Sequence, residues 1–142
     1  MRKLVIKTVL ISIAVIIFII GCLFGAFAIF SPKTIGEKAE KIGSFKVACW
    51  AYEKQFEKDD TDESLSDVNF IYKKYVINLI NDEKYSKATE ETISAIENNY
   101  FDSASVELIK YELNRAKEKQ NQSEENKKTI SNCIEKIEQN IK

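Results

Sequence analysis

The chain of 142 residues contains no histidine, and its last 99 residues (44–142) contain neither glycine nor proline. Without histidine it lacks the side chain most often used for acid–base catalysis near neutral pH and a common ligand of zinc. Without glycine, this long second part cannot form a phosphate-binding loop, and tight hairpin turns are disfavoured. We therefore expect no enzymatic activity, no metal site and no cofactor.

An excess of positive charge is also lacking. The chain has 21 basic and 22 acidic residues and a net charge of −1. Leaving out the basic residues Arg2, Lys3 and Lys7 gives 18 basic against 22 acidic residues after Ser31, a net charge of −4. Phosphate binding needs a basic face, so we expect no nucleic-acid partner.

Cysteine is scarce, with three residues in the chain. Cys22 lies in an apolar run, whereas Cys49 and Cys133 lie on the apolar faces of predicted helices. No CxxC pair exists, and no histidine is present to activate a thiol. We interpret Cys49 and Cys133 as small core residues. A disulfide between them would require the first and last helices of the polar region to touch.

The most informative feature that is present is the uncharged segment Thr8–Phe30, which follows a basic N-terminus. As a helix its 23 residues would be about 34 Å long, enough to cross a hydrocarbon core of about 30 Å. We predict that residues 1–31 form a short cytoplasmic tail and a single transmembrane helix, and that residues 32–142 form a helical domain. The basic tail favours a cytoplasmic N-terminus, which places the domain outside the cytoplasm at a bacterial cell membrane.

Three further interpretations of this segment stay open. Ala26-Phe27-Ala28 has the form of a signal-peptide cleavage site, and cleavage would release a secreted helical domain. Ile19-Ile20-Gly21-Cys22 resembles a bacterial lipobox, whose cysteine carries the lipid. Gly21 and Gly25 are four residues apart, a spacing that lets two membrane helices approach closely and form a homodimer.

Residues 32–142 show apolar positions at helical spacing, interrupted at intervals by helix start and stop signals. We predict an all-α fold of about five to six helices in an antiparallel array of hairpins. Ser64 and Asp67 have the spacing of a capping box at one helix start. The other signals are Pro32, Gly43-Ser44, the acidic segment 59–63, Asn81-Asp82, Asn98-Asn99, Asp102 and Ser123.

Two segments that lie 40 residues apart are similar. Gly43-Ser44-Phe45-Lys46-Val47-Ala48 parallels Glu83-Lys84-Tyr85-Ser86-Lys87-Ala88, and in both an aromatic residue precedes an alanine by three. This pattern resembles the second half of a tetratricopeptide repeat, although the family's tryptophan and closing proline are absent and its period is about 34 residues. The resemblance implies an array of helical hairpins that binds proteins. It also implies hairpin-packing roles for Gly43, Phe45, Ala48, Tyr52, Tyr85 and Ala88.

The predicted helix that follows the acidic segment has a second apolar side. Phe70 and Ile77 lie away from its core stripe and beside Lys73 and Lys74. An apolar strip next to two lysines suits a short acidic and hydrophobic segment of a protein partner, whose identity the residues do not reveal. The alternative is that Phe70 and Ile77 are buried, because a helix that is apolar on two sides is usually interior.

We therefore predict a membrane-anchored protein–protein interaction module, a scaffold or adaptor without catalytic activity. The alternative is a structural tether that associates with itself at the envelope. In that case the Gly21 and Gly25 face and the isoleucine stripe of the last helix would form the contacts between copies.

Overall fold

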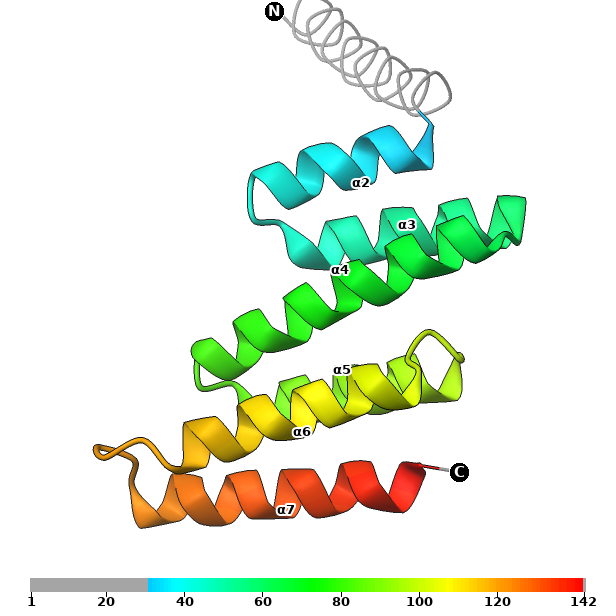
Figure 1. The fold of residues 1–142 in the computed structure, drawn as a ribbon. Coiled ribbons are helices and arrows are strands. Elements are labelled where there is room, and N and C mark those ends of the chain that lie inside the picture. Colours follow the sequence, from blue (N-terminus) through cyan, green and yellow to red (C-terminus); the bar gives the residue numbers. More distant parts are fainter. Residues whose placement is uncertain (1–30, 142) are drawn as a thin grey trace, which may run out of the picture.

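The computed structural model describes residues 31–141. Within this range the chain forms six α-helices and no strand, so the predicted all-α class is confirmed there. The helices stack from α2 at one end to α7 at the other (Figure 1). They are α2 (Pro32–Lys41), α3 (Phe45–Asp59), α4 (Asp62–Asn81), α5 (Tyr85–Glu97), α6 (Ser103–Lys117) and α7 (Glu124–Asn140).

Residues 31–141 include no helix that is long and apolar enough to cross a membrane. The predicted transmembrane segment Thr8–Phe30 lies outside the described residues, as do Gly21, Gly25 and Cys22. The membrane anchor, its packing face and the lipobox therefore remain predictions.

Side chains at the N-termini fix where several helices begin. The Ser31 hydroxyl accepts a hydrogen bond from the Thr34 amide, and Pro32 occupies the first position of α2. Asp102 caps α6 and Ser123 caps α7 in the same way, as predicted. A capping oxygen satisfies one of the backbone donors that the first turn of a helix leaves unpaired.

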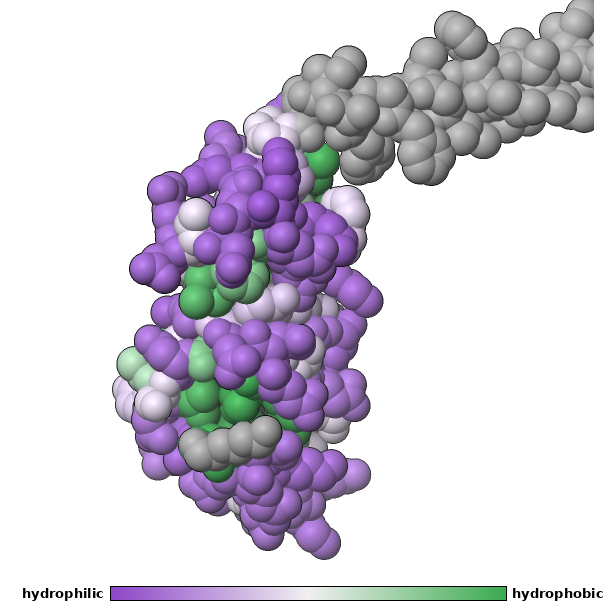
Figure 2. Space-filling view, turned by 90° about the vertical axis from the view of Figure 1, so that its right-hand side faces the viewer, coloured by the Kyte–Doolittle hydropathy of each residue, from purple (hydrophilic) through white to green (hydrophobic). Residues whose placement is uncertain are grey.

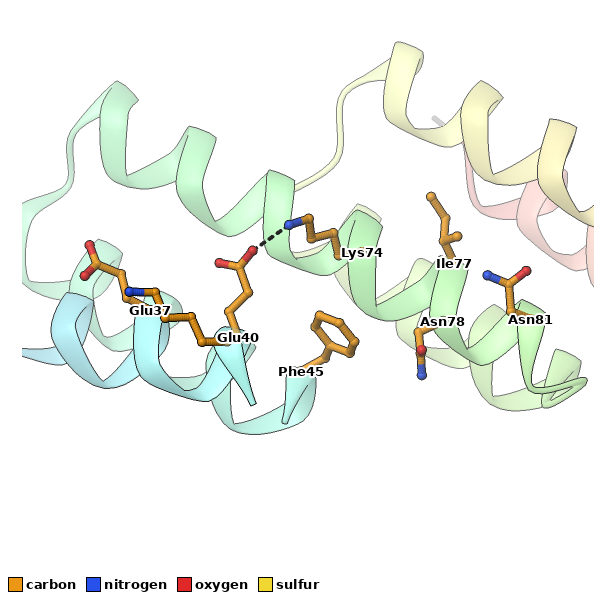
Figure 3. Close-up of a pocket in the computed structure, with 8 residues that line it drawn as sticks. Glu37, Glu40, Phe45, Lys74, Ile77, Asn78 and Asn81 are labelled. Atoms are coloured by element: carbon orange, nitrogen blue, oxygen red, sulfur yellow. Dashed lines mark hydrogen bonds and ion pairs between the residues drawn. The ribbon is translucent and has the colours of Figure 1, made fainter. Parts of the chain in front are cut away.

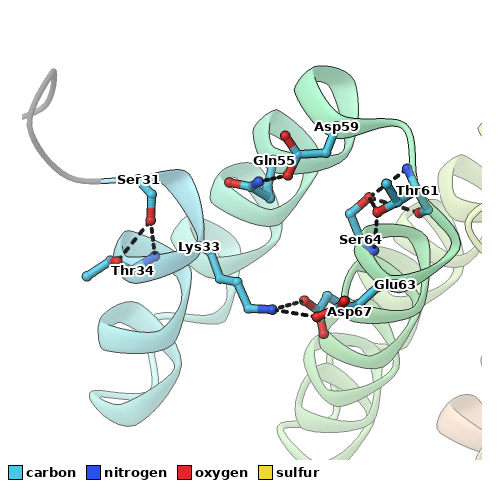
Figure 4. A network of polar contacts seen from close by, with 9 residues as sticks. All are labelled: Ser31, Lys33, Thr34, Gln55, Asp59, Thr61, Glu63, Ser64 and Asp67. Atoms are coloured by element: carbon cyan, nitrogen blue, oxygen red, sulfur yellow. Dashed lines mark hydrogen bonds and ion pairs between the residues drawn. The ribbon is translucent and has the colours of Figure 1, made fainter.

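The start of α4 differs from the prediction. Its N-cap is Thr61, which forms a reciprocal capping box with Ser64 (Figure 4). Asp67, the predicted partner of Ser64, instead forms an ion pair with Lys33 of α2 at 3.1 Å. The helix begins earlier because the Thr61 hydroxyl reaches the Ser64 amide, which leaves Asp67 to link two helices.

The turn between α2 and α3 has the same backbone as the turn between α4 and α5. The amides of Gly43 and Ser44 donate to carbonyls in the last turn of α2, and those of Glu83 and Lys84 do the same to α4. Gly43 has a φ of 74° and Glu83 a φ of 60°, so both are left-handed. The two similar segments, which lie 40 residues apart, therefore share this turn although only the first has the glycine. The turn between α5 and α6 has the same hydrogen bonds, with Asn99 at a φ of 58°.

Small residues allow the helices of each hairpin to pack closely. Ala48 of α3 and Ala88 of α5 are completely buried. Gly36 of α2 lies against the Tyr52 ring of α3, and a Cβ atom at Gly36 would be 2.8 Å from that ring. Tyr85 is also buried, so α5 contributes to the core from its first residue. Phe45 is partly buried and Gly43 lies exposed in the turn.

One face of the last helix, α7, is buried against its neighbours. Ile130, Cys133 and Ile137 of α7 are buried, and α7 contacts α5 and α6. Most of the isoleucine stripe therefore packs inside the chain, whereas Ile134 is partly buried and Ile141 is 43% exposed. Self-association through this stripe stays a prediction. The thiols of Cys49 and Cys133 are both free, so no disulfide links α3 to α7.

Candidate partner-binding surface

Helix α4 presents an aromatic side chain at the surface. Phe70 is 50% exposed, which excludes the alternative that it is buried in a central helix. The ammonium group of Lys74 lies 4.5 Å from the centre of its ring and 2.5 Å from the Glu40 carboxylate of α2. The ring and the lysine, one helical turn apart, are thus held in a defined arrangement by a cation–π contact and an ion pair.

A cavity of about 480 Å³ lies beside Lys74, between α2 and α4 (Figure 3). Phe45 and Ile77 provide apolar side chains in it, and both also pack against the core. The volume is within the range of about 300–1,000 Å³ that is typical of ligand pockets. The lining residues are Glu37, Glu40, Lys41, Phe45, Lys74, Ile77, Asn78 and Asn81.

The four predicted binding residues lie on the outer side of α4, but their surroundings differ. Lys74 and Ile77 line the cavity, whereas Phe70 is not among the lining residues and lies beneath the Lys74 ammonium group. Lys73 is partly buried and lies on the side of α6. Hydrogen bonds from Ser105 lower the pKa of Asp102 on that side, and the charge of Lys73 lowers it further. Lys74 therefore contacts the aromatic ring, whereas Lys73 acts on Asp102 at the start of α6.

Sequence reasoning missed most of the polar rim of this cavity. Glu37, Glu40 and Lys41 lie on one side of α2, at the i, i+3 and i+4 positions that share a helix face. Asn78 and Asn81 continue the α4 side one and two turns after Lys74. Each set could have been found as an exposed polar face. The sequence could not show that these two faces meet, because the contact joins residues more than 30 positions apart.

Two polar groups beneath this surface, on α4 and α3, are held by their neighbours. The Tyr72 hydroxyl donates a hydrogen bond to Glu53 at 2.5 Å, between α4 and α3. Burial, with the nearby charges of Glu53 and Glu91, raises the pKa of the Cys49 thiol far above its usual range. A thiol that stays protonated is a poor nucleophile. Residues 31–141 contain no group of histidine, cysteine or acidic side chains that could hold a metal ion.

Two further cavities lie toward the other end of the stack. One, of about 380 Å³, is bordered by Ile96, Phe101, Val106 and Ile141. Figure 2 shows apolar surface at this level of the molecule, surrounded by polar side chains. The other, of about 240 Å³, lies between α5 and α7 next to Cys133. Neither cavity contains any of the predicted binding residues.

Comparisons with protein-family models, curated proteins and solved structures found no match. The described residues define an all-α stack of helices with an aromatic side chain and a cavity on α4. The proposal of a function therefore depends on the geometry and chemistry of that surface.

Proposed function

We propose that this chain is a membrane-anchored module that binds another protein through the outer side of α4 and the cavity between α2 and α4. The observation that carries the proposal is the half-exposed Phe70 ring, which contacts Lys74, a residue that lines the cavity. A large aromatic ring at the surface gains free energy when a partner covers it, and such residues are enriched among binding hot spots.

The chemistry of the surface favours a particular kind of partner segment. Phe70, Phe45 and Ile77 would take apolar side chains, since each has exposed or partly exposed apolar area. Lys41 in the cavity and Lys73 on α4 add positive charge, although Glu37 and Glu40 also line the cavity and Glu40 is paired with Lys74. A short segment that combines acidic and hydrophobic side chains would complement both features.

The proposal includes the architecture and location predicted for the chain. The fully buried alanines Ala48 and Ala88, at equivalent positions of the two similar segments, support a degenerate tetratricopeptide-like array, in which stacked hairpins present binding surfaces. The segment Thr8–Phe30 would anchor the module as a single transmembrane helix with the N-terminus in the cytoplasm. The module would act by contact, without catalysis.

Site-specific photo-crosslinking in membranes of the producing cells tests the binding surface. A photoreactive residue would replace Asn78 or Asn81, which line the cavity, or Lys128, which is exposed on α7. We expect one adduct of the same mass from both cavity positions and none from Lys128. Adducts of equal yield from all three positions, or none from the cavity positions, would contradict the proposal.

The crosslinked partner can then be used to test Phe70 itself. We expect Phe70→Ser to weaken binding in detergent solution by about tenfold or more, because a covered aromatic hot spot is lost. Trp50→Ser is the matched control, since Trp50 on α3 is 46% exposed and lies outside the cavity. If both substitutions weaken binding equally, the loss of binding is not specific to the α4 surface.

A further inference from the structure

The hairpin formed by α2 and α3 has exposed apolar side chains that the α4 surface does not use. Three of the seven large hydrophobic residues exposed within residues 31–141 lie in it: Ile42 at 80%, and Val47 and Trp50 at 46% each. Val47 and Trp50 lie on the side of α3 opposite to Ala48 and Tyr52, which pack inward. This outer side of α3 therefore needs a separate explanation.

Lysines surround the tryptophan on that side of α3. Lys46, Trp50, Lys54 and Lys58 follow one another at four-residue spacing, so they form one row along the helix. Two acidic residues adjoin the row: Glu57 forms an ion pair with Lys54 at 2.5 Å, and Glu53, which accepts the Tyr72 hydroxyl, also acts on Lys54. The row therefore carries net positive charge around an exposed indole.

The position of this hairpin in the chain adds a second observation. The uncharged segment Thr8–Phe30 ends immediately before Ser31, the N-cap of α2. Helix α2 has 10 residues and is therefore about 15 Å long. It is packed directly on α3 through Gly36 and Tyr52. If the segment spans the bilayer, the outer side of α3 is tethered within about this distance of the headgroups.

We infer that the outer side of α3 rests on the membrane surface and binds anionic phospholipid headgroups. Tryptophan prefers the boundary between water and lipid, where its ring is apolar and its N–H stays hydrogen-bonded. Lysines extend their charge to headgroup phosphates while their methylene stems cover apolar surface. Contacts too weak to bind a free protein become effective here because the anchor keeps the local lipid concentration high.

This inference rests on the membrane anchor of the proposed function but not on the α4 binding surface. The contact would orient the stack against the bilayer and leave α4 and the cavity on another side of the hairpin. The single tryptophan of the chain is its natural reporter. The full-length protein would be reconstituted into liposomes of phosphatidylcholine alone or mixed with phosphatidylglycerol.

With phosphatidylglycerol present, we expect Trp50 emission to shift to shorter wavelength and acrylamide quenching to fall by about twofold or more relative to detergent. Quenching by a lipid with a spin label near its headgroup should appear at the same time. Lys46→Glu with Lys58→Glu should reverse these changes. Lys128→Glu with Lys136→Glu, the same charge change on exposed residues of α7, should leave them intact.

Flotation of the same liposomes separates failure of the anchor from failure of the surface contact. Protein that floats with the liposomes but shows no lipid quenching of Trp50 would overturn the inference and leave the anchor standing. Protein that does not float would overturn both. If diluting the protein in the bilayer abolishes the protection of Trp50 from acrylamide, a second copy of the chain covers the tryptophan. That result would also overturn the inference.

Discussion

Close contact between two residues determines how tightly the first hairpin packs. Gly36 of α2 faces the edge of the Tyr52 ring, where a Cβ atom would lie 2.8 Å from the nearest ring atom. We expect Gly36→Ala to lower the free energy of unfolding by about 1–3 kcal/mol, because overpacking forces a buried ring or a helix to shift. Urea denaturation followed by circular dichroism measures this change.

Gly43 provides the control, because its position requires a left-handed backbone but has room for a side chain. Its φ is 74°, and a Cβ atom there would meet nothing within 4 Å. Asparagine tolerates a left-handed backbone better than other residues with a Cβ atom. Gly43→Asn should therefore change the free energy of unfolding by less than about 0.5 kcal/mol. Equal losses from the two substitutions would show that the Gly36 contact is not tight.

At the scale of elements, one polar cluster joins the start of α6 to α4. The Asp102 carboxylate accepts hydrogen bonds from the Ser105 amide at 2.8 Å and from its hydroxyl at 2.5 Å. The Asn69 side chain of α4 donates to Ser105 Oγ at 3.0 Å and to the Tyr100 carbonyl at 2.8 Å. The cap of one helix thus also fixes its position against another.

We expect Asp102→Ala to lower the free energy of unfolding by about 1 kcal/mol, the usual effect of losing an N-cap. Asp102→Asn should retain most of the stability, since its carbonyl oxygen can accept the same amide. Thermal or urea denaturation near neutral pH measures both changes. If the two variants lose the same stability, the charge of Asp102 matters more than its hydrogen bonds.

The Asp102 cap also contributes to acid stability. Its hydrogen bonds with Ser105 lower the pKa of the folded state below the unfolded value of about 3.9. This contribution is present above about pH 4 and is lost as the pH falls through the folded pKa.

The elements show which features a sequence can predict. The starts of α2, α6 and α7 were predictable because Pro32, Asp102 and Ser123 act on the backbone of their own first turn. The start of α4 was misplaced because the pair of Ser64 and Asp67 satisfies the same local rule as the pair of Thr61 and Ser64. The role of Asp67 is decided by Lys33 of another helix.

The cavity was not predictable for the same reason. Its defining ion pair joins Glu40 and Lys74, which lie 34 residues apart. The hydrophobic pattern shows that Phe70 and Ile77 lie outside the core stripe of α4. How far each of these two side chains is exposed depends on the neighbouring helices. Here α3, α5 and α6 pack against α4 and leave Phe70 half uncovered, while Ile77 stays partly buried.

At the scale of the whole molecule, tyrosines are distributed through the core of the stack. The pKa is raised for five of the six tyrosines in the chain, in each case first by burial. The five are Tyr52, Tyr72, Tyr75, Tyr85 and Tyr100. Tyr72 has the additional effect of its hydrogen bond to Glu53, because a phenolate beside a carboxylate is disfavoured. The folded chain therefore holds phenol protons that the unfolded chain releases.

The consequence is a loss of stability at alkaline pH. Below about pH 10 the phenols are protonated in both states, so they add no pH dependence. Above about pH 10 the unfolded chain releases these protons while the folded chain keeps them, so the free energy of unfolding falls as the pH rises. The raised pKa values of Lys33, Lys54 and Lys110 act in the same direction, because their ion pairs weaken as the lysines lose charge.

Tyr72→Phe separates the phenols from the lysines. Near pH 8, about two units below the usual tyrosine pKa of about 10, the variant should be less stable by about 1 kcal/mol, because the hydrogen bond to Glu53 is lost. Between about pH 10 and about pH 12 its stability should fall less steeply than that of the natural chain, because one raised phenol has been removed while the lysines are unchanged. Urea denaturation at several pH values measures both slopes. Equal slopes would assign the alkaline loss to the lysine ion pairs and not to the buried tyrosines.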